Sequence, residues 1–346
     1  MSSCGCGCNG KPDVALGDLR TSPASVVMPL SAGTTWRDTI GGWLVRWGVG
    51  RMHYSVAPGL YRVGTPDAGS PVLVTANYKL TVDLVRSRLT GLNVWLLVLD
   101  TKGVNVWCAA GKGTFGTGEL VRRIASVNLG SLVNHRDLIL PQLGATGVAA
   151  HEVKRATGFA VHYGPVRASD IPAYLAAGMR ATQAMRRVRF GWRDRLVLAP
   201  VELVGALKPL GVVLGALLML TLIRNHRLTA HFAADAAPFI AAVVTGGVLV
   251  PLFLPWLPFR YFALKGAVAG IVVSAIMRAI LPWGIAEGTG TSLLVVAIAS
   301  YMAMMFTGST TFTTLAGVRR EVRRALPPIV ASAAIGAVLR VVAVFI

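Results

Sequence analysis

One segment of the chain, Asn105–Lys112, places a thiol where chemistry could be done. It reads Asn-Val-Trp-Cys-Ala-Ala-Gly-Lys, and its thiol is Cys108. Asn105 is a favourable helix N-cap, so Cys108 is predicted in the first turn of a short helix that Gly111 and Gly113 close. Unpaired N–H groups and the positive end of the helix dipole lower the pKa of a thiol in that turn. The resulting thiolate is a soft metal ligand.

Residue type alone leaves a second interpretation open. A lone Cys in an apolar segment is most often a small core residue, and Trp107 could simply pack under a sheet. A phosphate-binding loop, by contrast, is excluded by spacing. That loop needs four residues between its first Gly and a Gly-Lys pair, followed by Ser or Thr. Here seven residues separate Gly103 from Gly111, and Gly113 follows Lys112.

The elements around this segment alternate between strand and helix patterns. We expect strands at Val72–Ala76, Asn93–Leu99, Leu138–Leu140 and Phe159–Tyr163. We expect helices at Leu80–Leu89, Glu119–Val127, Val148–Thr157 and Ile171–Ala177. Such alternation predicts an α/β domain with a doubly wound, Rossmann-like parallel sheet. Ligands of these sheets bind outside the carboxyl ends of the strands.

The residues that follow the predicted strands at this edge are therefore candidates for cofactor contact. They are Asn77, Tyr78, Thr101, Lys102, Gly103, Gln142, Leu143, Gly144, Ala145, Gly164, Pro165, Val166 and Arg167. Each residue taken alone is explained by a structural role in a turn. Because all of them lie at the same edge of the sheet, together they could form a binding site.

The segment with Cys108 resembles the cap-helix signature of the mercury-methylating corrinoid protein family. Flanking segments resemble the corrinoid-binding domain of that family and, more distantly, the corrinoid iron–sulfur protein of acetyl-CoA synthesis. These segments are Pro71–Thr81, Leu140–Ala145, Val148–Val153 and Tyr163–Ala168. The resemblance covers roughly Arg51 to Ala177, and the hydrophobic C-terminal part is similar to the membrane domain of the same family.

The resemblance implies a base-off corrinoid (cobalamin) whose cobalt takes the Cys108 thiolate as its lower axial ligand. Further cofactor contacts are implied for Asn105, Val106, Trp107, Ala109, Gly111 and Lys112. The implied reaction is methyl transfer from methyl-cobalt(III) to inorganic Hg(II), giving methylmercury, with Cys108 as the catalytic residue. The implied partners are a ferredoxin-like iron–sulfur protein that supplies electrons and a folate-type methyl-donor system.

Two other functions remain open at this point. The chain could be a membrane-anchored corrinoid methyl carrier that serves another acceptor. It could also be a transporter with a corrinoid-sensing domain, because the charged residues Glu202, Lys208, Arg278 and Arg340 fall within or near apolar spans. Snorkelling or pairing between helices would account for those charges equally well.

Composition indicates a soluble module followed by a membrane module. The chain has 346 residues, of which 54% are hydrophobic, and a mean hydropathy of +0.60. We expect a tail and aromatic lead-in at 1–50, a corrinoid-binding domain at 51–185, a basic linker at 186–195 and a transmembrane domain at 196–346. The predicted spans are Val197–Ile223, Pro238–Leu257, Phe262–Trp283, Ser292–Phe312 and Pro327–Ile346.

The charge pattern predicts how the chain sits in the cell membrane. The net charge of +19 comes largely from arginines beside the spans. The positive-inside rule explains them without nucleic acid as a partner, and membrane lipid is the expected surroundings. The run Arg186–Arg195, the pair Arg260 and Lys265, and the run Arg319–Arg324 fall on one side. The soluble domain is therefore expected in the cytoplasm, with the C-terminus outside.

Two N-terminal features have alternative explanations. Cys4, Cys6 and Cys8 could capture Hg(II), or they could be incidental thiols in a mobile tail that extends to about Thr35. The aromatic segment Trp36–Val49 could lie on the membrane surface or pack in a core.

Overall fold

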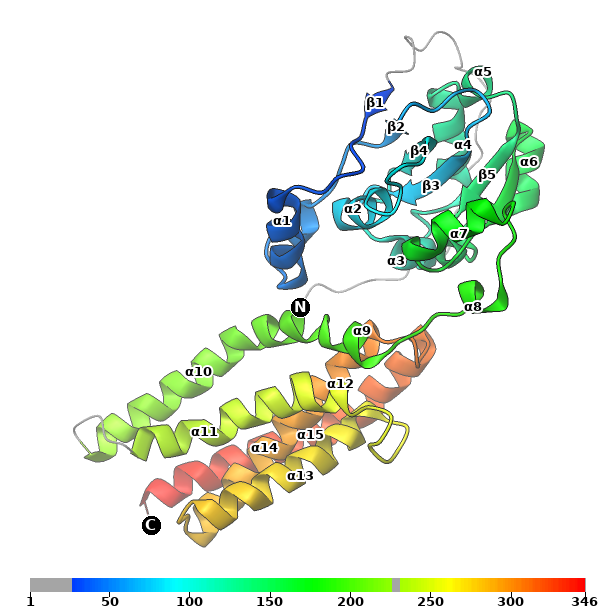
Figure 1. Cartoon of the computed structure of the whole chain (residues 1–346). Coiled ribbons are helices and arrows are strands. Elements are labelled where there is room, and N and C mark those ends of the chain that lie inside the picture. Colours follow the sequence, from blue (N-terminus) through cyan, green and yellow to red (C-terminus); the bar gives the residue numbers. More distant parts are fainter. Residues whose placement is uncertain (1–26, 226–230, 346) are drawn as a thin grey trace. The chain divides into compact units, whose positions relative to one another are not determined.

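A computed structural model of the chain describes residues 27–225 and 231–345. Cys4, Cys6 and Cys8 lie outside the described residues. The described chain divides into two units, which are drawn in Figure 1 and described here separately. The first holds the residues up to Thr34 and Tyr54–Arg186, and the second holds Thr35–His53 and Arg187–Ile346.

The first unit contains a mixed six-stranded sheet in the order β1-β2-β4-β3-β5-β6. The strands are β1 (Met28–Pro29), β2 (Gly59–Val63), β3 (Val72–Ala76), β4 (Val94–Leu99), β5 (Asp137–Leu140) and β6 (Ala160–Tyr163). The four strands β4, β3, β5 and β6 run parallel, as the alternating pattern predicts. Strand β2 is antiparallel to β4, and β1 pairs with β2. The predicted tail to Thr35 is therefore wrong at its end, because Met28 and Pro29 form an edge strand.

Helices cover both faces of this sheet (Figure 1). They are α2 (Lys79–Arg86), α3 (Val106–Lys112), α4 (Thr117–Ser126), α5 (Leu129–Leu132), α6 (Ala150–Thr157), α7 (Ile171–Ala176) and α8 (Gln183–Arg186). One apolar core lies between the sheet and α3 to α6, and it includes Leu97, Leu120 and Val153. A second core on the other face includes Leu96 from β4, Val82 from α2 and Tyr174 from α7. Every residue of β3 and β4 is buried, because both faces of the sheet are covered.

The strand order reverses between β3 and β5. From β3 the chain passes through α2 to β4 on one side, and from β4 it returns through α3 to α5 to β5 on the other side of β3. Loops that leave two neighbouring parallel strands in opposite directions open a crevice at the carboxyl ends of those strands. The fold therefore predicts a ligand site between the ends of β3 and β5.

The second unit is helical. Its elements are α1 (Trp36–Arg46), α9 (Trp192–Leu196), α10 (Ala199–Asn225), α11 (His231–Val244), α12 (Val250–Leu252), α13 (Phe262–Ile280), α14 (Ile285–Phe306) and α15 (Leu315–Phe345). A π-helical turn, Thr245–Leu249, joins α11 to α12. Five of the helical segments in the described chain are long and apolar enough to cross a membrane, which agrees with the predicted number. The predicted start of the fourth span at Ser292 is wrong, because α14 begins at Ile285.

Close glycine contacts bring α13 and α15 against α14. A Cβ on Gly266 of α13 would overlap the carbonyl oxygen of Ala299, and one on Gly336 of α15 would lie 2.8 Å from that of Gly290. Small residues of this kind allow helix backbones to approach each other within a membrane. Helix α14 is therefore the centre of the bundle formed by α13, α14 and α15.

Charged side chains in this unit join elements at the ends of the spans. Lys265 donates hydrogen bonds from Nζ to the carbonyl oxygens of Leu254 and Leu257, each at 2.7 Å. Near the other end of α15, the guanidinium of Arg340 pairs with Asp235 of α11 at 3.1 Å and with Glu287 of α14 at 2.6 Å. Arg340 thus ties three helices together, as expected for charges that pair between helices.

Helix α1 presents an apolar stripe to its surroundings. Thr35 caps it, with its hydroxyl oxygen accepting from the amide of Asp38 at 3.3 Å. Its inner face buries Gly42 and Val45. The outer stripe repeats at helical spacing and is exposed: Trp36, Ile40, Trp43, Leu44 and, just beyond the helix, Trp47. These five side chains are therefore not packed in a core.

Candidate functional site

A cavity of about 310 Å³ lies where the strand order reverses. It is lined by Leu73, Val74, Thr75, Thr81, Leu84, Val85, Asn105, Val106, Trp107, Ile139, Leu140, Pro141, Leu143, Pro165, Val166, Ala168 and Ile171. These residues come from β3 and the end of β5, from α2 and α7, from the start of α3 and from the segment after β6. The cavity therefore sits at the carboxyl edge of the parallel strands, beside the segment that carries Cys108.

One polar group in this cavity has no partner. The side chain of Thr75 is 2% exposed, and its hydroxyl oxygen has no hydrogen-bond partner among the described residues. An orphaned buried hydroxyl costs free energy, so it is unusual in an otherwise apolar strand. Because Thr75 lines the cavity, its hydroxyl is placed to form a hydrogen bond with a polar group of a bound ligand. A corrinoid, which carries amide side chains and a nucleotide arm, fits this requirement.

The segment that carries the thiol forms a capped helix, as the sequence predicts. The side-chain oxygen of Asn105 accepts a hydrogen bond from the backbone amide of Cys108 at 2.9 Å. At the other end, Gly113 has a left-handed backbone (φ 81°) and closes the helix. Val106, Ala109 and Ala110 are buried and anchor the helix to the core of the sheet.

Cys108 and Trp107 lie on the outer side of this helix. Cys108 is a free, exposed cysteine, so it is not a core residue. Trp107 is 45% exposed and lines the cavity, whereas Cys108 does not. The thiol is thus accessible from outside the protein, beside the cavity.

Asn77 fixes the loop that leads into this helix. Its side-chain oxygen accepts hydrogen bonds from three donors: the backbone amide of Thr101 at 3.1 Å, the hydroxyl of Thr101 at 2.8 Å and the amide of Gly103 at 3.0 Å. Both Asn77 and Thr101 are buried. Both residues are predicted from the sequence to contact the cofactor. In the structure they bind each other, so their polar groups position the loop.

The adjacent carboxylate of Asp100 is held by Lys102. The Lys102 ammonium donates to it at 2.7 Å, and the Lys102 backbone amide donates at 3.0 Å. These hydrogen bonds favour the charged form and lower the pKa of Asp100. The backbone amide of Asp100 donates to Glu119 of α4 at 2.9 Å, which fixes the end of β4. Lys102 has a positive φ of 58°, typical of such a tight turn.

Two glycines after β5 allow close packing under the cap helix. A Cβ on Gly144 would lie 2.5 Å from the Phe115 ring, and one on Gly147 would overlap the Phe115 carbonyl oxygen. The short helical turn Gln142–Gly144 packs directly against α3. Gly144, proposed as a cofactor contact, is buried and serves this packing.

The structure brings together six of the proposed contact residues around the cavity. They are Asn105, Val106, Trp107, Leu143, Pro165 and Val166. The others lie around it without lining it: Asn77, Tyr78, Thr101, Lys102, Gly103, Cys108, Ala109, Gly111, Lys112, Gln142, Gly144, Ala145, Gly164 and Arg167. The other eleven lining residues were not predicted: Leu73, Val74, Thr75, Thr81, Leu84, Val85, Ile139, Leu140, Pro141, Ala168 and Ile171. Thr75 could have been recognised from the sequence, because it is the one polar residue of an otherwise apolar strand.

Comparison with known proteins supports the relationship of this region to corrinoid proteins. A family model described as CO dehydrogenase/acetyl-CoA synthase delta subunit matches residues 44–175. The acetyl-CoA decarbonylase/synthase complex subunit gamma of Methanopyrus kandleri is 41% identical over 128 residues, which is 36% of this chain and 27% of that protein. The subunits of the same name from Archaeoglobus fulgidus and Methanosarcina acetivorans are 35% and 36% identical over 127 and 130 residues. Both matches again cover 36% of this chain and 27% of the relative. This chain therefore spans about a quarter of the length of these relatives.

Proposed function

We propose that this chain is a membrane-bound corrinoid protein that transfers a methyl group to Hg(II). The observation that carries the proposal is the Asn105–Lys112 helix, which carries the family signature and presents an exposed thiol beside a cavity with an orphaned hydroxyl. The relatives in acetyl-CoA decarbonylase/synthase complexes support the corrinoid part. We interpret the sheet as doubly wound, with the cofactor at the point where the strand order reverses.

The cavity sets how the cofactor would be held. A corrin ring with its side chains is several times larger than 310 Å³, so the cavity would take one arm of the cofactor. Cys108, which is exposed beside the cavity, would then hold a part of the cofactor that lies outside it. Thr75 would offer its hydroxyl to a polar group of the bound arm, and Trp107 would flank it.

The chain's own residues would have separate tasks. Cys108 would supply a strongly donating thiolate to hold the cobalt. Asn105 would hold the Cys108 amide and so fix the orientation of the first helical turn, while Asn77 would fix the loop before it. A bound corrinoid would supply the methyl group on its metal, and the cobalt would need reduction before it could accept the next methyl group. A ferredoxin-like protein and a folate-type methyl donor would restore the starting state.

The test compares the full chain with Cys108→Ala and Cys108→Ser. We expect visible and EPR spectra of the bound cobalamin that change when the thiol is removed, together with loss of methylmercury formation. The Cys108→Ser variant nearly keeps the size of the side chain and preserves the helix, so it controls for packing. Full methylmercury production by either variant would refute the role of Cys108.

A second candidate function is supported by the same comparisons. The relatives' names place them in complexes that handle acetyl-CoA, so this chain could carry a methyl group for an acceptor other than Hg(II). Both functions require the cofactor and the thiol. They separate in an assay with the methylated protein, because only the first predicts loss of the methyl group on addition of Hg(II) alone.

We further propose that the chain lies in the cell membrane with the sheet-containing unit in the cytoplasm. Five helical segments can span a bilayer, and the arginines of Arg319–Arg324 support that orientation. Helix α1 would lie in the cytoplasmic interface, because its exposed tryptophans Trp36, Trp43 and Trp47 are flanked by Arg37 and Arg46. The role of Cys4, Cys6 and Cys8 in Hg(II) capture stays a prediction.

A further inference from the structure

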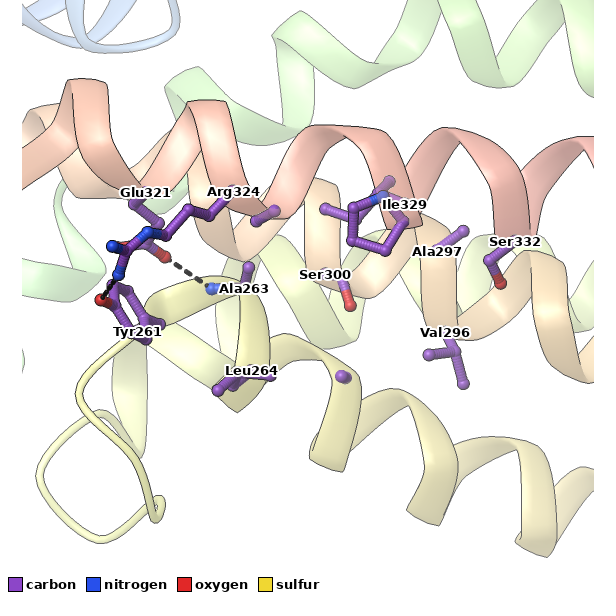
Figure 2. Close-up of a pocket in the computed structure, with 13 residues that line it drawn as sticks. Tyr261, Ala263, Leu264, Val296, Ala297, Ser300, Glu321, Arg324, Ile329 and Ser332 are labelled. Carbon is purple, nitrogen blue, oxygen red and sulfur yellow. Dashed lines mark hydrogen bonds between the residues drawn. The ribbon is translucent and has the colours of Figure 1, made fainter.

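A groove runs between α13 and α15 with α14 as its floor. Its volume is about 300 Å³, and most of its lining is apolar. The lining consists of Tyr261, Ala263, Leu264, Ala267, Val296, Ala297, Ser300, Glu321, Arg324, Ala325, Pro328, Ile329 and Ser332. Figure 2 shows Tyr261, Glu321 and Arg324 at one end, and mainly aliphatic side chains with the hydroxyls of Ser300 and Ser332 along the rest. The groove thus has a polar head and an apolar body.

The packing of the helices explains why the groove stays open. The close approach of Gly266 and Gly336 holds α13 and α15 against α14. At the polar end, two hydrogen bonds join α13 and its lead-in to α15. The amide of Ala263 donates to the Glu321 carboxylate at 2.8 Å, and the Arg324 guanidinium donates to the Tyr261 hydroxyl at 3.0 Å. Beyond this end the two outer helices flank the lining of small and aliphatic residues (Figure 2).

The polar end carries positive charge that the described residues leave available. Arg324 is exposed and forms no ion pair with any described residue, and its hydrogen-bond partner here is the hydroxyl of Tyr261. The nearby carboxylate of Glu321 is buried and accepts from the start of α13. The first turns of α15 carry four arginines against one glutamate. A guanidinium and a phenol whose proton is still free to donate form two adjacent donors for a phosphate oxygen.

We propose that this groove binds one anionic glycerophospholipid. Its phosphate sits at Arg324 and Tyr261, and one acyl chain lies along Leu264, Val296 and Ile329. The charge at one end and the apolar lining of the rest match the two parts of such a lipid. The arginines of α15 lie at the end of a span, which is where a lipid headgroup lies in a bilayer. This site is independent of the corrinoid proposal, because it involves only residues of the helical unit.

The experiment uses the full chain in nanodiscs with equal amounts of phosphatidylglycerol and phosphatidylcholine. After mild detergent extraction, native mass spectrometry counts the lipids that stay bound. Wild type is expected to retain phosphatidylglycerol over phosphatidylcholine by about fivefold, the preference that one arginine near anionic lipid supplies. Arg324→Gln is expected to abolish that preference. Arg323→Gln is the matched control, because Arg323 is exposed on the same helix and does not line the groove.

A second variant tests the apolar part. Ala267→Phe places a ring in the groove and is expected to reduce retention of both lipids, while Arg324→Lys is expected to restore part of the preference that Arg324→Gln loses. Circular dichroism of each variant confirms that the helices are intact. Equal retention of the two lipids by wild type, or equal losses in Arg323→Gln and Arg324→Gln, would overturn the proposal.

Discussion

Replacing Asn77 with Ala is expected to loosen the loop that carries the cap helix. The substitution removes one oxygen that accepts from three donors. The Thr101 hydroxyl can still donate to the carbonyl oxygen of Val104 at 2.6 Å. The amides of Thr101 and Gly103 have no such substitute. A buried donor without a partner costs about 1–3 kcal/mol. Because Gly103 is only half-buried, we expect a total of about 2–3 kcal/mol for the two amides.

Amide hydrogen exchange of the full chain measures this cost directly. A loss of about 2–3 kcal/mol corresponds to exchange about 30- to 150-fold faster in the peptide that covers residues 101–113. Asn105→Ala is the matched comparison, since it removes a single cap bond worth about 1 kcal/mol and should accelerate exchange about fivefold. Exchange in Asn77→Ala within about threefold of wild type would show that the three hydrogen bonds do not hold the loop.

Three further outcomes are expected. Thr75→Val removes the orphaned hydroxyl, so it should leave the cofactor-free protein unchanged or stabilise it by about 1 kcal/mol, while weakening cobalamin binding about tenfold in an absorbance titration. A destabilised Thr75→Val protein would contradict this reasoning. Because the pKa of Asp100 is lowered in the folded protein, its hydrogen bonds stabilise the fold fully at pH values above the unfolded-state pKa of about 3.9. This stabilisation is lost as the pH falls through the lower folded-state pKa. Lys102→Gln should therefore move the carboxyl titration of Asp100, followed by NMR, to higher pH, and an unchanged titration would refute the assignment. A nitroxide in place of Trp43 should collide with oxygen more than with a water-soluble nickel chelate in reconstituted protein, and one in place of Asp38 should show the reverse.

The parallel strands and the cap helix could be predicted because local sequence determines them. Val94–Leu99 is an unbroken apolar run, and a run of this kind indicates a strand buried on both faces. Asn105 and Gly113 carry cap preferences that hold wherever a helix begins or ends. The five apolar segments are recognised by their length, although α14 extends seven residues before its predicted start because Gly and Thr are tolerated in an apolar helix.

The remaining features depend on contacts between distant parts of the chain. Strand β2 was not predicted, because its pairing with β4 is antiparallel and joins segments about 35 residues apart. The role of Asn77 could not be read from its type, since an amide can face a ligand or a loop equally well. Only the fold shows that the backbone of Thr101 and Gly103 reaches it. Likewise, Leu84 and Ile171 line the cavity because α2 and α7 share one face of the sheet.

The central place of α14 has a consequence for how the membrane unit is made. The ribosome delivers α11 and α13 before α14, the helix against which both pack. Until α14 arrives, Gly266 of α13 faces lipid or another chain in place of Ala299. The bundle can therefore condense only after the fourth span has been inserted, and a chain that stops after α13 would present an incomplete set of helices to the quality control of the membrane.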